Sequence, residues 1–85
     1  TWKSLFEQAD KNERNNVVIG SNITLKNAVD SLVVNNTGKL IIVEGIDNMV
    51  VVNTKDAILI CSKDKEQEVK TLVSEIKKEH KGKYN

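Results

Sequence analysis

Two residues in this sequence have side chains that often do chemistry, and neither has a partner at a useful spacing. His80, the only histidine, lies in a lysine-rich tail, where a solvated position at a helix end is expected. Cys61, the only cysteine, ends an apolar run and is expected to be a buried small hydrophobe without an internal disulfide. No second histidine or cysteine is placed to complete a zinc site. A single free cysteine fits a reducing compartment, so a cytoplasmic location is expected.

The acidic residues, lysines and glycines also lack the arrangement of a catalytic or phosphate-binding site. Three aspartates are each explained by a turn or a helix cap: Asp47, Asp56 and Asp64. Asp30 lies inside an apolar stretch, and we expect it at a coil corner or pointing outward from a strand. Three lysines form a solvated charged face rather than an anion site: Lys63, Lys65 and Lys70. Gly38 and Gly45 are isolated turn glycines. We expect no catalytic residue, no cofactor and no metal in this chain.

Length and charge exclude several classes of function. The 85 residues suffice for a single domain, residues 1–85, with a modest core. Basic and acidic residues nearly cancel, 13 against 12, so no clustered basic face for a nucleic acid is expected. No apolar run approaches the ~20 residues that a membrane-spanning helix needs. We therefore expect neither a nucleic acid nor a membrane as a partner.

Residues 17–61 are predicted to form a β-region. Its most apolar part reads as two strands, 49–52 and 57–61, around a polar turn at 53–56. Neither run alternates apolar with polar residues, so both faces of each strand are expected to be covered. Two series of apolar residues recur every six positions: Val17, Ile23 and Val29, then Val34, Leu40, Ile46, Val52 and Ile58. This period indicates a short left-handed parallel β-helix-like domain, and a small β-meander or sandwich capped by a helix is the alternative.

A short helix is predicted at residues 1–9. Trp2, Leu5 and Phe6 fall on one helical face, and Thr1 could cap the helix. These three side chains either pack on the core of their own domain or form a contact with another domain or subunit. We therefore mark Trp2, Leu5 and Phe6 as the candidate interdomain or subunit contact of a docking helix.

An amphipathic helix is predicted at residues 64–78. Its apolar positions follow helical spacing: Val69, Leu72, Val73 and Ile76. Asp64 is the expected N-cap, with Gln67 completing a capping box, and Glu66 and Lys70 are expected to pair. Since only two residues separate this helix from the last strand, we expect its apolar stripe to cap the β-region.

The same stretch resembles a known family. The matching positions occur in one order: GIDNMVVV at 45–52, TKDAILI at 54–60, Lys63-Asp64 and Val69-Lys70. In order and spacing they are similar to the C-terminal domain of bacterial mannose-1-phosphate guanylyltransferases, or GDP-mannose pyrophosphorylases. Trp2 and Leu5 fit the Trp-x-x-Leu segment that leads into that domain. The family usually has Gly-Asn where this chain has Asn15 and Asn16, so Asn15 is expected to adopt the left-handed backbone conformation.

The resemblance implies a non-catalytic role for this chain. It implies a short left-handed β-helix that serves as the C-terminal structural and oligomerisation domain of a nucleotidyltransferase. The parent enzyme would convert GTP and mannose 1-phosphate into GDP-mannose and pyrophosphate, with magnesium held by an N-terminal catalytic domain upstream of Thr1. The expected partners are that missing catalytic domain and further copies in a homo-oligomer. The alternative is a free-standing β-rich protein-interaction module with no catalytic function.

Overall fold

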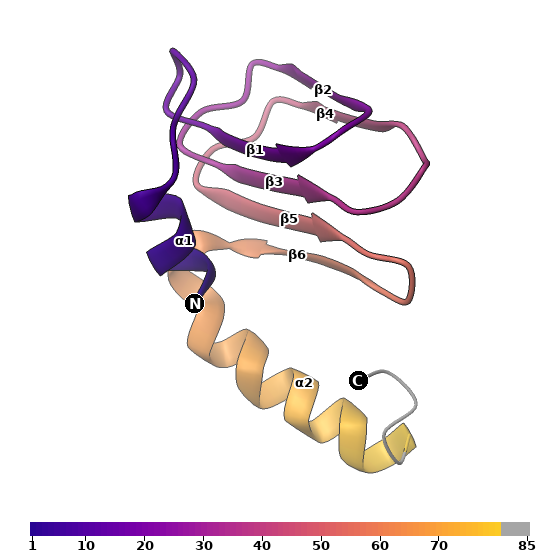
Figure 1. Ribbon diagram of the computed structural model, residues 1–85. Coiled ribbons are helices and arrows are strands. Elements are labelled where there is room, and N and C mark those ends of the chain that lie inside the picture. The colour runs from indigo at the N-terminus through magenta and orange to yellow at the C-terminus, as the bar shows by residue number, and fades with distance from the viewer. Residues whose placement is uncertain (81–85) are drawn as a thin grey trace.

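A computed structural model describes residues 1–80 of the chain (Figure 1). The elements follow in this order: α1 (Trp2–Gln8), β1 (Val17–Gly20), β2 (Ile23–Lys26), β3 (Leu32–Asn35), β4 (Ile41–Glu44), β5 (Met49–Asn53), β6 (Ile58–Ser62), the 3-10 turn η1 (Lys63–Lys65) and α2 (Glu66–His80). Among these residues, no helix has both the length and the apolar composition needed to cross a bilayer.

The strands form a three-sided parallel coil. β1, β3 and β5 pair in parallel on one side, and β2 and β4 pair in parallel on the second. A single parallel bridge between Val29 and Asp47 marks the third side. Val17 and Ile23 begin the first strands of the first two sides, as the six-residue period predicts. The β-helix class is therefore confirmed, although the sheets do not close, and the hand of the coil stays a prediction.

Asparagine and aspartate make the corners of the coil. Five such residues have a positive φ, which these two residue types tolerate better than other side chains: Asn15, Asn22, Asn27, Asp30 and Asn48. The left-handed conformation predicted for Asn15 is confirmed. At Gly20, with φ +102°, only glycine fits, because a Cβ there would collide with the backbone oxygen of Asn35. The corners thus depend on residues that accept αL geometry at each turn of the chain.

A buried amide ladder holds one corner together. Asn35 and Asn53 are neighbours on β3 and β5, and they are only 3% and 6% exposed. The Nδ2 of Asn35 donates to the carbonyls of Ser21 and Lys39 at 2.9 and 2.7 Å. Its Oδ1 accepts from the backbone and hydroxyl of Thr37 and from Nδ2 of Asn53. These bonds satisfy buried polar groups that would otherwise destabilise the corner.

The apolar core lies on both faces of the larger sheet. On the outer face, Phe6 of α1 packs against four buried side chains: Val17, Leu32, Val50 and Val52. Inside the coil, Val33, Val43 and Val51 form a second cluster with partly buried neighbours. The strands of this sheet alternate between the two clusters, so β3 and β5 are apolar on both faces, as predicted for residues 49–52.

The last strand turns back instead of continuing the coil. β6 pairs antiparallel with β5 after a turn in which the N–H of Thr54 donates to the carbonyl of Ala57 at 2.9 Å. This hairpin confirms the two strands predicted around a polar turn. The expectation that β6 is covered on both faces is wrong, because Ile58 and Ile60 remain 63% and 64% exposed. Leu40 is also 61% exposed, so the second six-residue series does not follow the core throughout.

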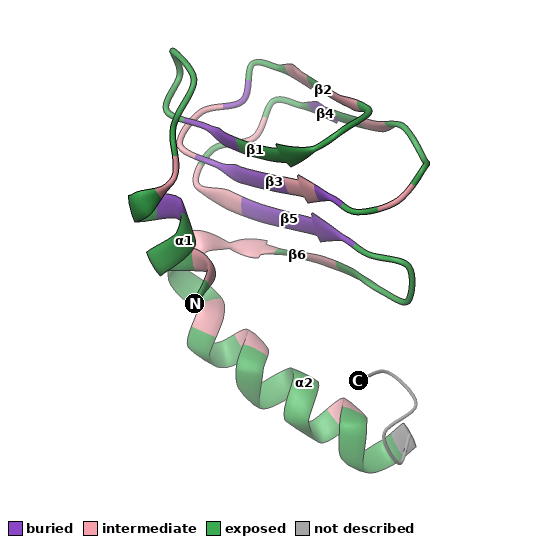
Figure 2. Cartoon of the chain, viewed as in Figure 1, coloured by how far each residue is buried: buried purple, intermediate pink, exposed green. Residues whose placement is uncertain are grey.

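α2 diverges from the sheet instead of lying on it. Figure 1 shows the helix running away below β6, and Figure 2 shows that most of its surface is exposed. Leu72 and Val73 of the predicted capping stripe are 55% and 38% exposed. The helix therefore does not bury β6, and the expected capping by its stripe is not seen in this chain.

The N-terminal cap of this helix also differs from the prediction. Asp64 lies within η1, and the side chain of Ser62 caps that turn by accepting from the N–H of Asp64. The carboxylate of Asp64 instead accepts from Nδ2 of Asn48 at 2.7 Å. The difference arises because the 3-10 turn lies between β6 and the α-helix. The α-helix therefore begins at Glu66, two residues later than predicted, and Asp64 lies beside a coil corner. The predicted pair of Glu66 and Lys70 is confirmed at 3.7 Å.

Candidate docking groove

A side-chain cap stabilises the first turn of α1. Some residues on the apolar face of this helix contact the core, and others contact solvent. Oγ1 of Thr1 accepts from the backbone N–H of Ser4 at 3.0 Å. Phe6 is only 7% exposed and belongs to the domain's own core. Trp2 packs partly against the same core, while Leu5 is 37% exposed. Of the three residues marked as a candidate contact, Phe6 is used internally, Trp2 lies partly against the core, and Leu5 is exposed.

A lysine on the 3-10 turn packs over the face of the Phe6 ring. Nζ of Lys63 lies 3.4 Å from the centroid of the Phe6 ring and donates to the carbonyl of Asp30 at 2.6 Å. A cation over an aromatic face is attracted by the electrons of the ring. Burial lowers the pKa of Lys63, and the carboxylates of Asp30 and Asp64 oppose that shift. The contact joins α1 to the end of the β-region and fixes the direction in which α1 presents Trp2.

An apolar groove opens between α1, β6 and α2. Its first hollow has a volume of about 540 Å³. Its apolar walls come from three elements: Trp2 and Leu5 of α1, Leu59 and Cys61 of β6, and Val69 and Val73 of α2. A second hollow of about 420 Å³ continues along β6 toward Leu72 and Ile76. The two hollows share Trp2, Leu59, Val69 and Val73, and we call the combined feature the helix groove.

The helix groove exists because α2 touches the β-region only near the first turns of the helix. Leu59 and Val52 lie on the outer face of the sheet, at the border of the cluster around Phe6, and both line the second hollow. The stripe on α2 faces the same space without filling it, since Leu72 and Val73 remain exposed. Water therefore contacts apolar side chains on both walls. An exposed apolar patch of this kind marks a surface for another protein or a ligand.

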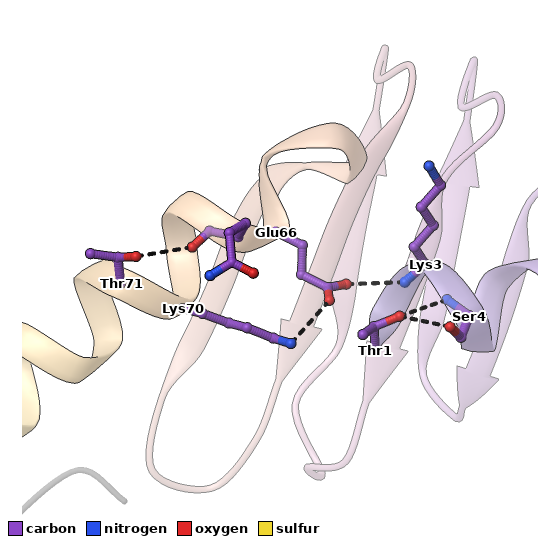
Figure 3. A network of polar contacts seen from close by, with 7 residues as sticks. Thr1, Lys3, Ser4, Glu66, Lys70 and Thr71 are labelled. Carbon is purple, nitrogen blue, oxygen red and sulfur yellow. Dashed lines mark hydrogen bonds and ion pairs between the residues drawn. The ribbon is translucent and has the colours of Figure 1, made fainter.

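One charged residue joins the two helices at the rim of the helix groove. Oε1 of Glu66 accepts from the backbone N–H of Lys3 at 3.1 Å, and Oε2 lies 3.7 Å from Nζ of Lys70 (Figure 3). The side chain of Glu66 is 15% exposed, whereas that of Lys70 is 57% exposed. The ion pair itself adds little stability because the ammonium group is largely in water. The hydrogen bond from the N–H of Lys3 to Glu66 is what ties the start of α1 to the first turn of α2.

Cys61 forms part of the groove wall, in a setting that disfavours its thiolate. Burial raises the pKa of its thiol, and the nearby carboxylate of Glu66 raises it further. Reactive cysteines have the opposite setting, with cations or helix N-termini that stabilise the thiolate. The free thiol is only partly buried, on the groove wall, so the fully buried position expected from the sequence is not what the structure shows.

The remaining candidates for chemistry have structural roles. Asp30 lies at a coil corner, as expected, where Oδ1 accepts from Nδ2 of Asn15 at 2.7 Å. In the part of the chain that the structure describes, no group of three His, Cys, Asp or Glu side chains could hold a metal ion. His80 is the last residue of α2, and its side chain lies outside the described part. The groove offers mainly apolar surface for binding.

The geometry of the coil has counterparts among known proteins. The sequence profile of the MannoseP isomerase/GMP-like beta-helix domain matches residues 20–76. A solved structure from Thermus thermophilus, described as a mannose-1-phosphate geranyltransferase, aligns with a TM-score of 0.76 over 89% of this chain and 23% of that one. Its sequence identity is 23%, so this likeness concerns the fold.

Relatives at higher identity have longer chains. A mannose-1-phosphate guanylyltransferase from Klebsiella pneumoniae is 32% identical over 84 residues, which are 99% of this chain and 17% of the relative. The alginate biosynthesis protein AlgA from Pseudomonas fluorescens is 44% identical over 73 residues, which are 86% of this chain and 15% of the relative. This chain therefore spans about a sixth of the length of these curated relatives.

Proposed function

Because this chain belongs to the family of MannoseP isomerase/GMP-like beta-helix domains, we propose that it is the C-terminal structural domain of a mannose-1-phosphate guanylyltransferase. The observation that carries the proposal is the end-to-end likeness to such enzymes, among them a Vibrio cholerae relative 34% identical over 99% of this chain and 18% of its own length. The parent enzyme would join the guanylyl part of GTP to mannose 1-phosphate, releasing pyrophosphate. Its catalytic residues and its magnesium ion would belong to the rest of that protein.

The role of this domain would be to stabilise the parent enzyme and to help it form oligomers. The helix groove supports the first part, since apolar side chains on α1, β6 and α2 face an unfilled space. Thr1 itself lines the groove, so a polypeptide that precedes Thr1 would join the domain beside this surface. Filling the groove with apolar side chains from the catalytic domain would remove the exposed patch from water.

The proposal predicts that the chain alone does not turn over substrate. Among the described residues there is no metal-binding cluster, and the aspartates discussed above are used at corners. The purified chain, incubated with GTP, mannose 1-phosphate and magnesium, should release no pyrophosphate above a blank. The longer parent protein should release it under the same conditions. Turnover by the isolated chain that persists through a second purification would overturn the assignment.

A further inference from the structure

The outer half of α2, residues 72–79, has charged side chains that no ion pair occupies. The two ion pairs of this region join Lys65 to Glu68 and Lys70 to Glu66, and all four residues precede Leu72. From Leu72 onward the described part of the helix contains no ion pair, although three exposed charged side chains border its apolar stripe: Glu75, Lys77 and Glu79. Since the exposed part of the stripe lies in the same segment, unpaired charges and unfilled apolar surface occur together (Figure 2).

These charges are sorted by sign around the stripe. Each residue of an α-helix advances by about 100° around the axis, so the angular positions follow from the sequence. Lys77 borders one side of the stripe and lines the first hollow of the helix groove. Glu75 and Glu79 border the other side and line neither hollow. An apolar seam with a cation along one border and carboxylates along the other is typical of a helix that packs against another helix.

The pattern specifies the chemistry of a complementary helix. The stripe from Val69 to Ile76 is about 10 Å long, or about two helical turns, which suits a short amphipathic helix lying along α2. Such a helix would place apolar side chains on the stripe, a carboxylate beside Lys77 and a cation beside Glu75 or Glu79.

A second copy of α2 does not meet this requirement. In an antiparallel pair each border of the stripe would meet the same border of the other helix, so Lys77 would face Lys77 and the glutamates would face glutamates. A parallel second copy would bring its own β-region to the end of the groove where Glu66 already ties α2 to Lys3 of α1. Both arrangements disfavour α2 as its own partner.

The position of Thr1 indicates where the complementary helix comes from. Thr1 and Lys77 line the same hollow, so a polypeptide that precedes Thr1 would join the domain on the side of the groove that Lys77 borders. This chain spans only 17% of the Klebsiella pneumoniae relative and 15% of the Pseudomonas fluorescens relative. Most of a parent enzyme of that length would therefore lie outside this domain.

We propose that the helix groove binds an amphipathic helix from the polypeptide that precedes Thr1, and that Lys77 pairs with a carboxylate on the border of that helix. The inference rests on the proposed function, because it names the part of the parent enzyme that fills the groove. The ion pair lies at an exposed rim, so it orients the helix, while the apolar stripe supplies most of the affinity.

The first test is zero-length cross-linking of the full parent protein with a carbodiimide, which joins a lysine amine to a carboxylate in direct contact. Peptide mass spectrometry should find Lys77 joined to an aspartate or glutamate that precedes Thr1. Lys77→Arg keeps the charge and should remove this cross-link without displacing the helix. Lys78, which lies nearly opposite the stripe, should form no such link. Links that run only to carboxylates of residues 1–85, or a Lys77 that reacts no more than Lys78, would refute the proposal.

The second test measures amide hydrogen exchange in the outer half of α2. These amides should exchange about tenfold or more slowly in the parent protein than in the isolated chain, because the bound helix holds α2 in place. In the parent protein Lys77→Glu should speed their exchange about twofold to fivefold, the size of an exposed ion pair, and high salt should reduce the difference. Lys78→Glu makes the same charge change one residue away and should have no effect. Equal effects of the two variants would contradict recognition through Lys77.

The two proposals fail in distinguishable ways. If the parent protein makes GDP-mannose and Lys77 links to nothing that precedes Thr1, the inference alone is wrong. A parent protein without guanylyltransferase activity would overturn the assignment, whatever Lys77 contacts.

Discussion

At the scale of single residues, buried polar side chains determine the corners of this coil. Asn35 shows the principle, because its amide bonds to Ser21, Lys39, Thr37 and Asn53 at once. An apolar replacement would leave several of these groups buried without a partner. The corner thus depends on one side chain whose type alone satisfies both donors and acceptors.

We predict that Asn35→Ala lowers the free energy of unfolding by about 3 kcal/mol, the sum expected when a few buried groups lose their partners. Asn36→Ala is the matched control, because Asn36 is the next residue, is exposed, and bonds to Asn53 through its backbone. That control should change the free energy of unfolding by less than about 0.5 kcal/mol. Urea unfolding followed by circular dichroism measures both, and equal midpoints would show that the ladder is not stabilising.

The thiol of Cys61 gives a second prediction at this scale. Burial raises its pKa, followed in size by the effect of Glu66, so the native thiol is more protonated than a free one. Alkylation by iodoacetamide at about pH 8.5, near the pKa of a free thiol, should therefore be several-fold slower in the native protein than in urea. A native rate equal to the unfolded rate would contradict the buried setting.

The same shift has a consequence for stability. A thiol with a raised pKa in the folded state binds its proton more tightly there than in the unfolded chain. Between the unfolded and the folded pKa the folded state holds more protons, so stability falls as pH rises through that window. Cys61→Ala should remove this part of the alkaline decline while leaving the rest of the pH profile in place.

At the scale of elements, α2 is the part that sequence periodicity describes only partly. The spacing of its apolar residues correctly indicates a helix with one apolar stripe. Periodicity states which residues share a face and does not state what that face contacts. In this chain the stripe faces the helix groove, and Ile58 and Ile60 of β6 stay mostly exposed, bordering both that groove and a hollow beside β4.

We expect this difference in packing to appear as a difference in local stability. β3 and β5 lie between two core clusters, whereas α2 is mostly exposed beyond its first turns (Figure 2). Amide hydrogen exchange of the isolated chain should therefore be slowest in β3 and β5 and much faster in the second half of α2. Equal protection of α2 and β5 would mean that the helix is held more firmly than its contacts indicate.

At the scale of the whole molecule, the fold class could be predicted from the sequence. The six-residue spacing of Val17, Ile23 and Val29 indicates the right class, and the polar turn at 53–56 correctly marks the hairpin of β5 and β6. The amide ladder and most of the left-handed corners leave a weaker signal, because asparagine is common in any turn. Prediction of Asn15 succeeded because the family resemblance pointed to that position.

Less of the candidate site could be predicted from the sequence. The sequence marks Trp2, Leu5 and Phe6 as one apolar face, and the structure divides them between a core position and the wall of the helix groove. That division depends on where β6 ends and on how Lys63 holds the ring of Phe6.

The central claim is that the helix groove is filled by the rest of a longer enzyme, and one pair of measurements tests it directly. Leu72→Asp is introduced both into the isolated chain and into the full parent protein, and the thermal unfolding of this domain is followed in each. In the isolated chain Leu72 is 55% exposed, so the midpoint should shift by no more than about 2–4 °C, equivalent to some 0.5 kcal/mol.

In the parent protein the same carboxylate would be forced into an apolar contact, and the domain should lose about 2–3 kcal/mol or separate from its neighbour. Lys70→Asp at the solvated rim should have a small effect in both settings. A shift that is equally small in the isolated chain and in the parent protein would contradict the account, because Leu72 would then face water in the complete enzyme as well.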